Sequence, residues 1–255
     1  MNDPAAGTTT APDALGGRAL LLLLAGCSAL GPVASLLVLP SLPAIRADFA
    51  VGTAATQGVI SSFLIAFACG ILVGGPLSDR YGRRPTMLAG LVVFLVGTVL
   101  CVFATTLPTL IGGRIVQALG ASVGLTVARA TVGDLYRDWR MARALANLTL
   151  FMMIGTTVSP YVGGIGAEHY GWHASFVVML VAGFGILVAA WRLLPATRPS
   201  APTTQSFANI GRASMTVLRN KMFFACALDS SVIYAVYLVF ISIAPYVMSE
   251  MYDRP

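Results

Sequence analysis

The sequence predicts an all-α protein that crosses a membrane several times. Of its 255 residues, 57% are hydrophobic and only 10% are charged, and the mean hydropathy is +0.82. A soluble domain of average composition carries about 25% charged residues. The apolar residues are grouped into runs of about twenty, which is the length that a helix needs to cross the hydrocarbon core of a bilayer.

Seven such runs set the expected order of elements: residues 18–41, 56–75, 86–104, 107–131, 142–167, 172–194 and 222–248. The first six predict a helical bundle over residues 18–194. Residues 1–17, rich in Thr, Ala, Pro and Gly, are expected to be a disordered cytoplasmic tail. Residues 195–221 contain three prolines and predict a cytoplasmic linker to a seventh helix within residues 222–255.

The basic residues predict the orientation of these helices. If the connection near residue 80 is cytoplasmic, two basic residues, Arg46 and Arg254, fall on the opposite side. The cytoplasmic side then holds twelve: Arg18, Arg80, Arg83, Arg84, Arg137, Arg140, Arg143, Arg192, Arg198, Arg212, Arg219 and Lys221. Cytoplasmic loops carry such an excess, so we expect a cytoplasmic N-terminus. The sequence pI of about 9.5 does not indicate nucleic-acid binding, because no basic stripe with interleaved aromatic residues is present.

Residues 75–85, GPLSDRYGRRP, carry one carboxylate and three guanidinium groups between the second and third runs. Because these charges cannot lie in hydrocarbon, we expect a tight turn at the membrane surface. The pattern G-x-L-x-D-R-x-G-R-R resembles the loop between helices 2 and 3 of the major facilitator superfamily of transporters. The resemblance implies a gate that latches the cytoplasmic side, built from Gly75, Asp79, Arg80, Gly82, Arg83 and Arg84. The alternative is a loop that only fixes topology and anchors the chain to the membrane.

Arg114 lies about two turns into the fourth run, and Gln117 follows one turn later. A guanidinium inside a span is costly, so we expect it to face an aqueous cavity or a partner, with snorkelling to the interface as the alternative. The segment resembles the helix-4 motif R-x-x-Q-G of the superfamily, in which the arginine is tied to proton movement. Ala118 takes the usual glycine place, and we expect Gly120 to supply the close helix contact.

The fifth run contains GTTVSPYVGG over residues 155–164. Small residues at these intervals allow close helix packing, and an internal proline frees a backbone carbonyl and bends a helix. The segment resembles the antiporter motif G-x-x-x-G-P-x-x-G-G, matched here by Gly155, Ser159, Pro160, Gly163 and Gly164. Ser159 stands where the motif has glycine, and a generic proline kink is the alternative.

Three further segments, residues 31–45, 129–136 and 240–247, resemble the Bcr/CflA branch of drug/proton antiporters. Members of that branch export amphipathic drugs and small metabolites across the bacterial inner membrane. The branch usually has an acid on helix 1 where this chain has Leu36. Asp229, about two turns into the seventh run, is then the candidate proton carrier, because burial favours the protonated form of a carboxylate. The alternative is a hydrated Asp229 beside Lys221 near the cytoplasmic mouth.

The resemblance implies a major facilitator fold with about seven of the usual twelve helices, embedded in the bacterial inner membrane. We expect export of drugs or small amphipathic compounds, driven by the proton gradient without a cofactor. The expected partners are the lipid bilayer, the substrate and the proton, and no nucleic acid. Two six-helix halves form such transporters, so the alternatives are a truncated non-transporting fragment and a subunit that pairs with itself or with a second half-transporter. A metabolite transporter of the same superfamily is a further alternative. The chain shows no nucleophile–base set, metal cluster or phosphate-binding loop, so we expect neither an enzyme nor a metal site.

Overall fold

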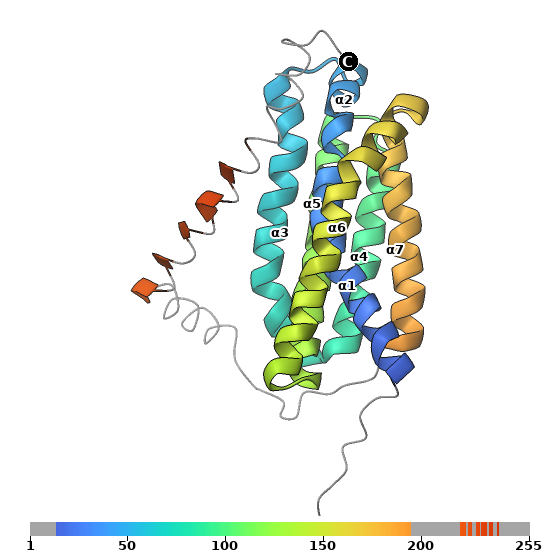
Figure 1. Ribbon diagram of the computed structural model, residues 1–255. Helices are drawn as coiled ribbons and strands as arrows, with labels where there is room; N and C mark the ends of the chain where they lie inside the picture. Colours follow the sequence, from blue (N-terminus) through green and yellow to red (C-terminus); the bar gives the residue numbers. More distant parts are fainter. Residues whose placement is uncertain are drawn as a thin grey trace, which may run out of the picture. The chain divides into compact units, whose positions relative to one another are not determined.

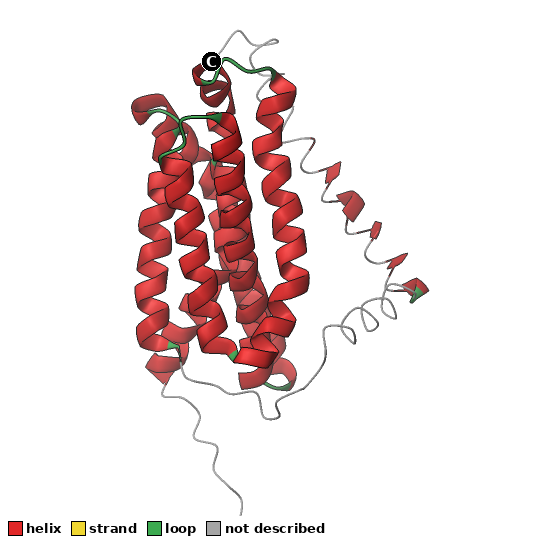
Figure 2. Cartoon of the chain, turned by 180° about the vertical axis from the view of Figure 1, so that it is seen from behind, coloured by secondary structure: helices red, strands yellow, loops and turns green. Residues whose placement is uncertain are grey.

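Six helices long and apolar enough to cross a membrane are arranged side by side in the computed structural model (Figure 1). The structure describes residues 14–194 and single positions between 220 and 239. The first span combines α1 (Ala14–Leu37), a 3-10 turn at Leu39–Ser41 and α2 (Leu42–Asp48). The other five are α3 (Thr53–Tyr81), α4 (Arg83–Val102), α5 (Leu107–Leu135), α6 (Asp138–Tyr170) and α7 (His173–Leu193). No strand occurs among the described residues (Figure 2).

The six spans lie where the apolar runs predict them, but several helices are longer than the runs. The second run covers residues 56–75, whereas α3 covers Thr53–Tyr81. A helix of 29 residues is about 44 Å long, which exceeds the hydrocarbon core of about 30 Å. Hydropathy therefore marks the part of the helix inside the core and misses the turns among the lipid headgroups.

The ends of the chain differ from expectation only in part. Residues 14–17, expected in the disordered tail, form the first turn of α1. Residues 1–13, and residues 195–219 of the expected linker, lie outside the described residues. The described positions from 221 to 239 are helical, and residues 240–255 lie outside the described part. The chain divides into two compact units, Met1–Pro202 and Thr203–Pro255, and all six spans belong to the first.

The expected tight turn between the second and third runs is present, but it is much shorter than residues 75–85. The α3 helix continues to Tyr81, α4 begins at Arg83, and Gly82 alone lies between them. Gly82 has φ +95°, a conformation that side chains with a Cβ rarely adopt. The charged residues of this segment therefore occupy the ends of two helices, beyond the hydrocarbon core, where Arg80 is exposed and Arg83 is buried.

The α4 and α5 helices have the most extensive contact in the bundle, and glycines bring their backbones together. A Cβ at Gly97 would overlap the backbone of Gln117, and a Cβ at Gly120 would overlap the backbone of Phe94. The expectation that Gly120 supplies a close helix contact is therefore met by the geometry. Close backbone approach of this kind is typical of membrane helices.

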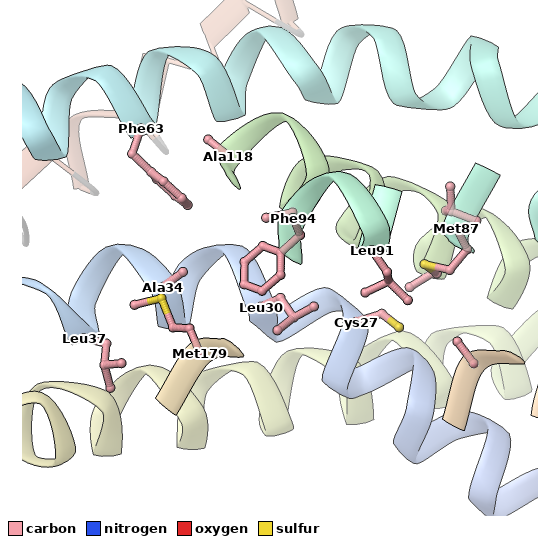
Figure 3. Close-up of a cluster of buried hydrophobic side chains, with 14 of the residues drawn as sticks. Cys27, Leu30, Ala34, Leu37, Phe63, Met87, Leu91, Phe94, Ala118 and Met179 are labelled. Carbon is pink, nitrogen blue, oxygen red and sulfur yellow. The ribbon is translucent and has the colours of Figure 1, made fainter. Parts of the chain in front are cut away.

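The apolar core draws buried side chains from every helix of the bundle. Leu30 and Ala34 of α1, Phe94 of α4 and Met179 of α7 belong to one buried cluster (Figure 3). Phe94 has no exposed surface, and Leu30 is 7% exposed. These contacts hold α1 against the α4–α5 pair, and the arginine of α5 lies near the same level.

Candidate functional site

Arg114 is the only charged side chain without exposed surface among the described residues. Its Nη1 donates to Gln117 Oε1 at 2.7 Å and to the Ala34 carbonyl of α1 at 3.2 Å. Its Nε donates to the Val59 carbonyl of α3 at 3.5 Å. The guanidinium is thus held inside the bundle by three helices and does not extend toward a helix end.

Aromatic rings supply the rest of the environment of Arg114. Its Cζ lies 4.0 Å from the ring centroid of Phe63 and 5.9 Å from that of Phe176. A cation over an aromatic face is stabilised by the ring quadrupole, by about 2 kcal/mol where water is excluded. One nitrogen, Nη2, is buried without a hydrogen-bond partner among the described residues. The site therefore holds a positive charge with one donor unused.

Between residues 14 and 194, no carboxylate compensates this charge at mid-span. The acidic residues between positions 14 and 194 all lie at or near helix ends: Asp48, Asp79, Asp134, Asp138 and Glu168. Leu36, which stands where the resemblance places an acid, is 4% exposed. A buried charge without a counter-ion is costly and usually marks a functional position in a membrane protein.

Gln117 extends the polar contacts of Arg114 across the α4–α5 contact. Its Nε2 donates to Thr98 Oγ1 at 2.8 Å and lies 3.3 Å from Met179 Sδ. Thr98 in turn donates to the Phe94 carbonyl at 2.7 Å. Arg114 and Gln117, which the sequence pairs, do form one contact, whereas Thr98 and Met179 were missed. A threonine next to Gly97 in an apolar run is the signal that could have identified Thr98.

A second cluster joins three helices at the end of the bundle where α3 turns into α4. Arg83, 8% exposed, donates Nε to Asp134 Oδ2 at 2.8 Å. Its Nη1 donates to Asp79 Oδ1 and to Ser78 Oγ, each at 2.5 Å. Asp134, whose side chain is partly exposed, thereby ties the end of α5 to the start of α4. Asp79 has its ion-pair partner, Arg83, within the first unit.

The other residues of the predicted gate make fewer polar contacts than Arg83. Arg80 is exposed, with Cζ 5.5 Å from the ring centroid of Tyr81. Arg84 donates Nη2 to the Trp191 carbonyl near the end of α7 at 2.7 Å. A Cβ on Gly75 would have no neighbour within 4 Å. Among these residues, Arg83 and Asp79 form the connected centre.

Replacing Arg83 with glutamine should lower the stability of the bundle by about 1–2 kcal/mol, because two half-exposed ion pairs and one hydrogen bond are lost together. Thermal unfolding of the purified chain in detergent measures the loss. Arg80→Gln removes the same charge from the end of α3, where Arg80 has no ion pair among the described residues, and should change the unfolding midpoint little. Equal shifts of the unfolding midpoint for the two variants would show that the ion pairs of Arg83 do not stabilise the bundle.

The motif of α6 divides into residues that face α1 and residues that do not. A Cβ at Gly163 would overlap the Leu37 carbonyl, a Cβ at Gly155 would lie 3.0 Å from Val33 Cγ2, and Ser159 is 3% exposed. The helix continues through Pro160, which is partly buried. The nearest atom to a Cβ on Gly164 is Pro40 Cβ at 3.8 Å, an ordinary contact. Positions 155, 159 and 163 thus form the stripe along which α6 approaches α1.

Asp229 belongs to the second unit, where it is helical and exposed.

Comparisons with known proteins agree with this architecture. Residues 20–253 match the family model described as Major Facilitator Superfamily. "Multidrug resistance protein D" of Escherichia coli K12 is 32% identical over 187 residues, covering 73% of this chain and 48% of the relative. "Multidrug resistance protein MdtL" of Escherichia coli O127:H6 is 30% identical over 213 residues, covering 84% of this chain and 54% of the relative.

A solved structure, a peptide transporter in complex with sulfate, superposes with a TM-score of 0.64 at 18% identity. The match covers 89% of this chain and 46% of that transporter. The chain therefore spans about half the length of the relatives that it matches. The matched residues cover α2 to α7 in full and α1 from residue 20 onward, and the chain belongs to the Major Facilitator Superfamily.

Proposed function

We propose that this chain takes part in proton-coupled export of drugs or other small amphipathic compounds. The observation that carries the proposal is the buried, uncompensated Arg114 and its contact with Gln117 in the middle of the bundle. The names of the multidrug resistance relatives support the substrate class. Such substrates need a cavity with generic apolar walls and few fixed polar groups.

Antiport requires that proton binding change the interactions of a charged site. A carboxylate is charged while it is ionised, and protonation removes that charge. We infer that Asp229 carries the coupling proton, because every acid between residues 14 and 194 lies at or near a helix end.

The Asp79–Arg83–Asp134 cluster is proposed to hold the cytoplasmic gate with the other residues of its motif. Its support is geometric, since one guanidinium connects the ends of α3, α4 and α5. Arginines of the first unit gather at this end of the bundle, at positions 18, 80, 83, 84, 137, 140, 143 and 192. By the positive-inside rule we assign this end, and the N-terminus, to the cytoplasmic face of a bacterial inner membrane.

Replacing Asp229 with asparagine should abolish proton-coupled export, because an amide cannot carry a proton in this role. The measurement is accumulation of a fluorescent amphipathic dye in a host without other pumps, with and without a proton uncoupler. Asp229→Glu keeps the carboxylate and should retain a substantial part of the uncoupler-sensitive export. Full export by Asp229→Asn would show that the proton is carried elsewhere.

A further inference from the structure

A cavity of about 310 Å³ lies between the ends of α1, α5 and α6, away from Arg114. Its walls combine two kinds of side chain. Leu21 and Ala144 are apolar, and the remaining lining residues are Arg18, Tyr136, Trp139, Arg140, Arg143 and Asn147. The volume is at the lower end of the range found for small-molecule sites, enough for a polar headgroup.

Three arginines, Arg18, Arg140 and Arg143, are among the residues that line this cavity, and no lining residue is acidic. Both ion pairs within residues 14–194 involve Arg83, so Arg18, Arg140 and Arg143 pair with no acid of this part of the chain. Arg140 instead lies with its Cζ 5.6 Å from the ring centroid of Trp139. Guanidinium groups with free donors bind phosphate oxygens well, because their planar fork matches two oxygens at once.

The position of the cavity suggests the source of the phosphate. The lining residues belong to the first two turns of α1, the first three turns of α6 and the residue after α5, so they lie near a membrane surface. Trp139 is 65% exposed, as expected for an aromatic residue at the headgroup level. A soluble anion gains nothing from the apolar wall, whereas a phospholipid presents a phosphate and apolar atoms together. Basic pockets between membrane helices on the cytoplasmic side bind anionic headgroups.

We propose that this cavity binds a phosphate group, and that an anionic phospholipid of the surrounding leaflet supplies it. Arg18 and Arg143 bind the phosphate from two helices, Arg140 adds a third positive charge, and the Leu21 side contacts the glycerol and upper acyl chain. A bound lipid then joins the start of α1 to the start of α6, two helices that also meet at the Gly163 contact.

The test uses the whole chain purified in detergent and titrated with phosphatidylglycerol, with phosphatidylcholine as the uncharged reference. Native mass spectrometry counts the lipid adducts. We expect retention of phosphatidylglycerol over phosphatidylcholine, and a loss of at least about tenfold in that preference for Arg18→Gln/Arg140→Gln/Arg143→Gln. Equal retention of the two lipids by the unmodified chain would overturn the proposal.

A matched variant removes three arginines at the same end of the bundle that do not line the cavity: Arg80→Gln/Arg137→Gln/Arg192→Gln. It should keep the lipid preference within about twofold, apart from a general effect of net charge. An equal loss of lipid preference in both triple variants would mean that the preference depends only on the net charge of the chain, and it would contradict a defined site. Inorganic phosphate should not displace the lipid at millimolar concentration, and full displacement would overturn the lipid as the source.

A second measurement needs no change to the arginines. Trp139 lines the cavity, so phosphatidylglycerol brominated on the upper acyl chain should quench its fluorescence more than brominated phosphatidylcholine does. Trp139→Phe leaves Trp172 and Trp191 as the remaining tryptophans and should remove this difference. A difference that survives in Trp139→Phe would place the lipid elsewhere and refute the site.

Discussion

Replacing Arg114 with methionine is expected to abolish export while the bundle stays folded. Methionine is long, unbranched and apolar, so it can fill the space beside Phe63 without the cost of a buried charge. Gln117 loses one hydrogen bond, at about 1–3 kcal/mol, and the removal of an uncompensated cation offsets that loss. The melting temperature in detergent should therefore remain close to that of the unmodified chain, while dye accumulation rises to the level of cells without the pump.

Arg114→Lys separates charge from geometry. Lysine keeps the positive charge but lacks the planar fork that reaches both Gln117 Oε1 and the Ala34 carbonyl. We expect partial, uncoupler-sensitive export from this variant. Export by Arg114→Met at the unmodified rate would show that the cation is not needed, and the proposed coupling would be wrong.

Replacing Gly120 with alanine should destabilise the bundle more than any other single methyl group added to α5. The added Cβ would meet the backbone nitrogen and Cα of Phe94 and the Gly90 carbonyl, and backbone atoms cannot rotate away. Overpacking of this kind costs about 1–3 kcal/mol, and separation of the helices should also weaken the Gln117–Thr98 hydrogen bond. Thermal unfolding and the yield of monodisperse protein measure the effect.

Gly112→Ala is the matched control, because it adds the same methyl group to the same helix where no atom lies within 4 Å. Alanine also has the higher helix propensity, so this variant should be as stable as the unmodified chain or slightly more so. A similar loss for both variants would mean that the α4–α5 contact does not determine stability.

The sequence identifies the spans well because hydrophobic length is a direct requirement of the bilayer. It identifies helix ends poorly, because the charges of residues 79–84 are compatible either with a loop or with helix ends outside the hydrocarbon core. Gly82 alone reverses the direction of the chain, whereas the sequence suggested a turn of eleven residues. Hydropathy contains no term that distinguishes these two arrangements.

The environment of Arg114 was predictable only in part. Its spacing to Gln117 is local, so the contact follows from the helical repeat. The Ala34 and Val59 carbonyls and the Phe63 ring come from helices remote in sequence. Any residue type can supply a backbone carbonyl, so the sequence does not show which carbonyls accept a hydrogen bond. A phenylalanine in an apolar run cannot be distinguished from an ordinary core residue. For the same reason, the contact of Met179 with Gln117 could not be predicted. The ion pair between Arg83 and Asp134 could not be predicted because the two residues are far apart in the sequence.

The glycine contacts between α4 and α5 also have a mechanical consequence. Two helices whose backbones touch share almost no flexible side-chain layer, so the pair resists bending and sliding more than helices separated by long side chains. The Arg114–Gln117–Thr98 hydrogen bonds connect the same pair. During a transport cycle we therefore expect α4 and α5 to keep a constant spacing and to carry Arg114 with them. Elastic deformation should then be concentrated at softer contacts around this stiff pair.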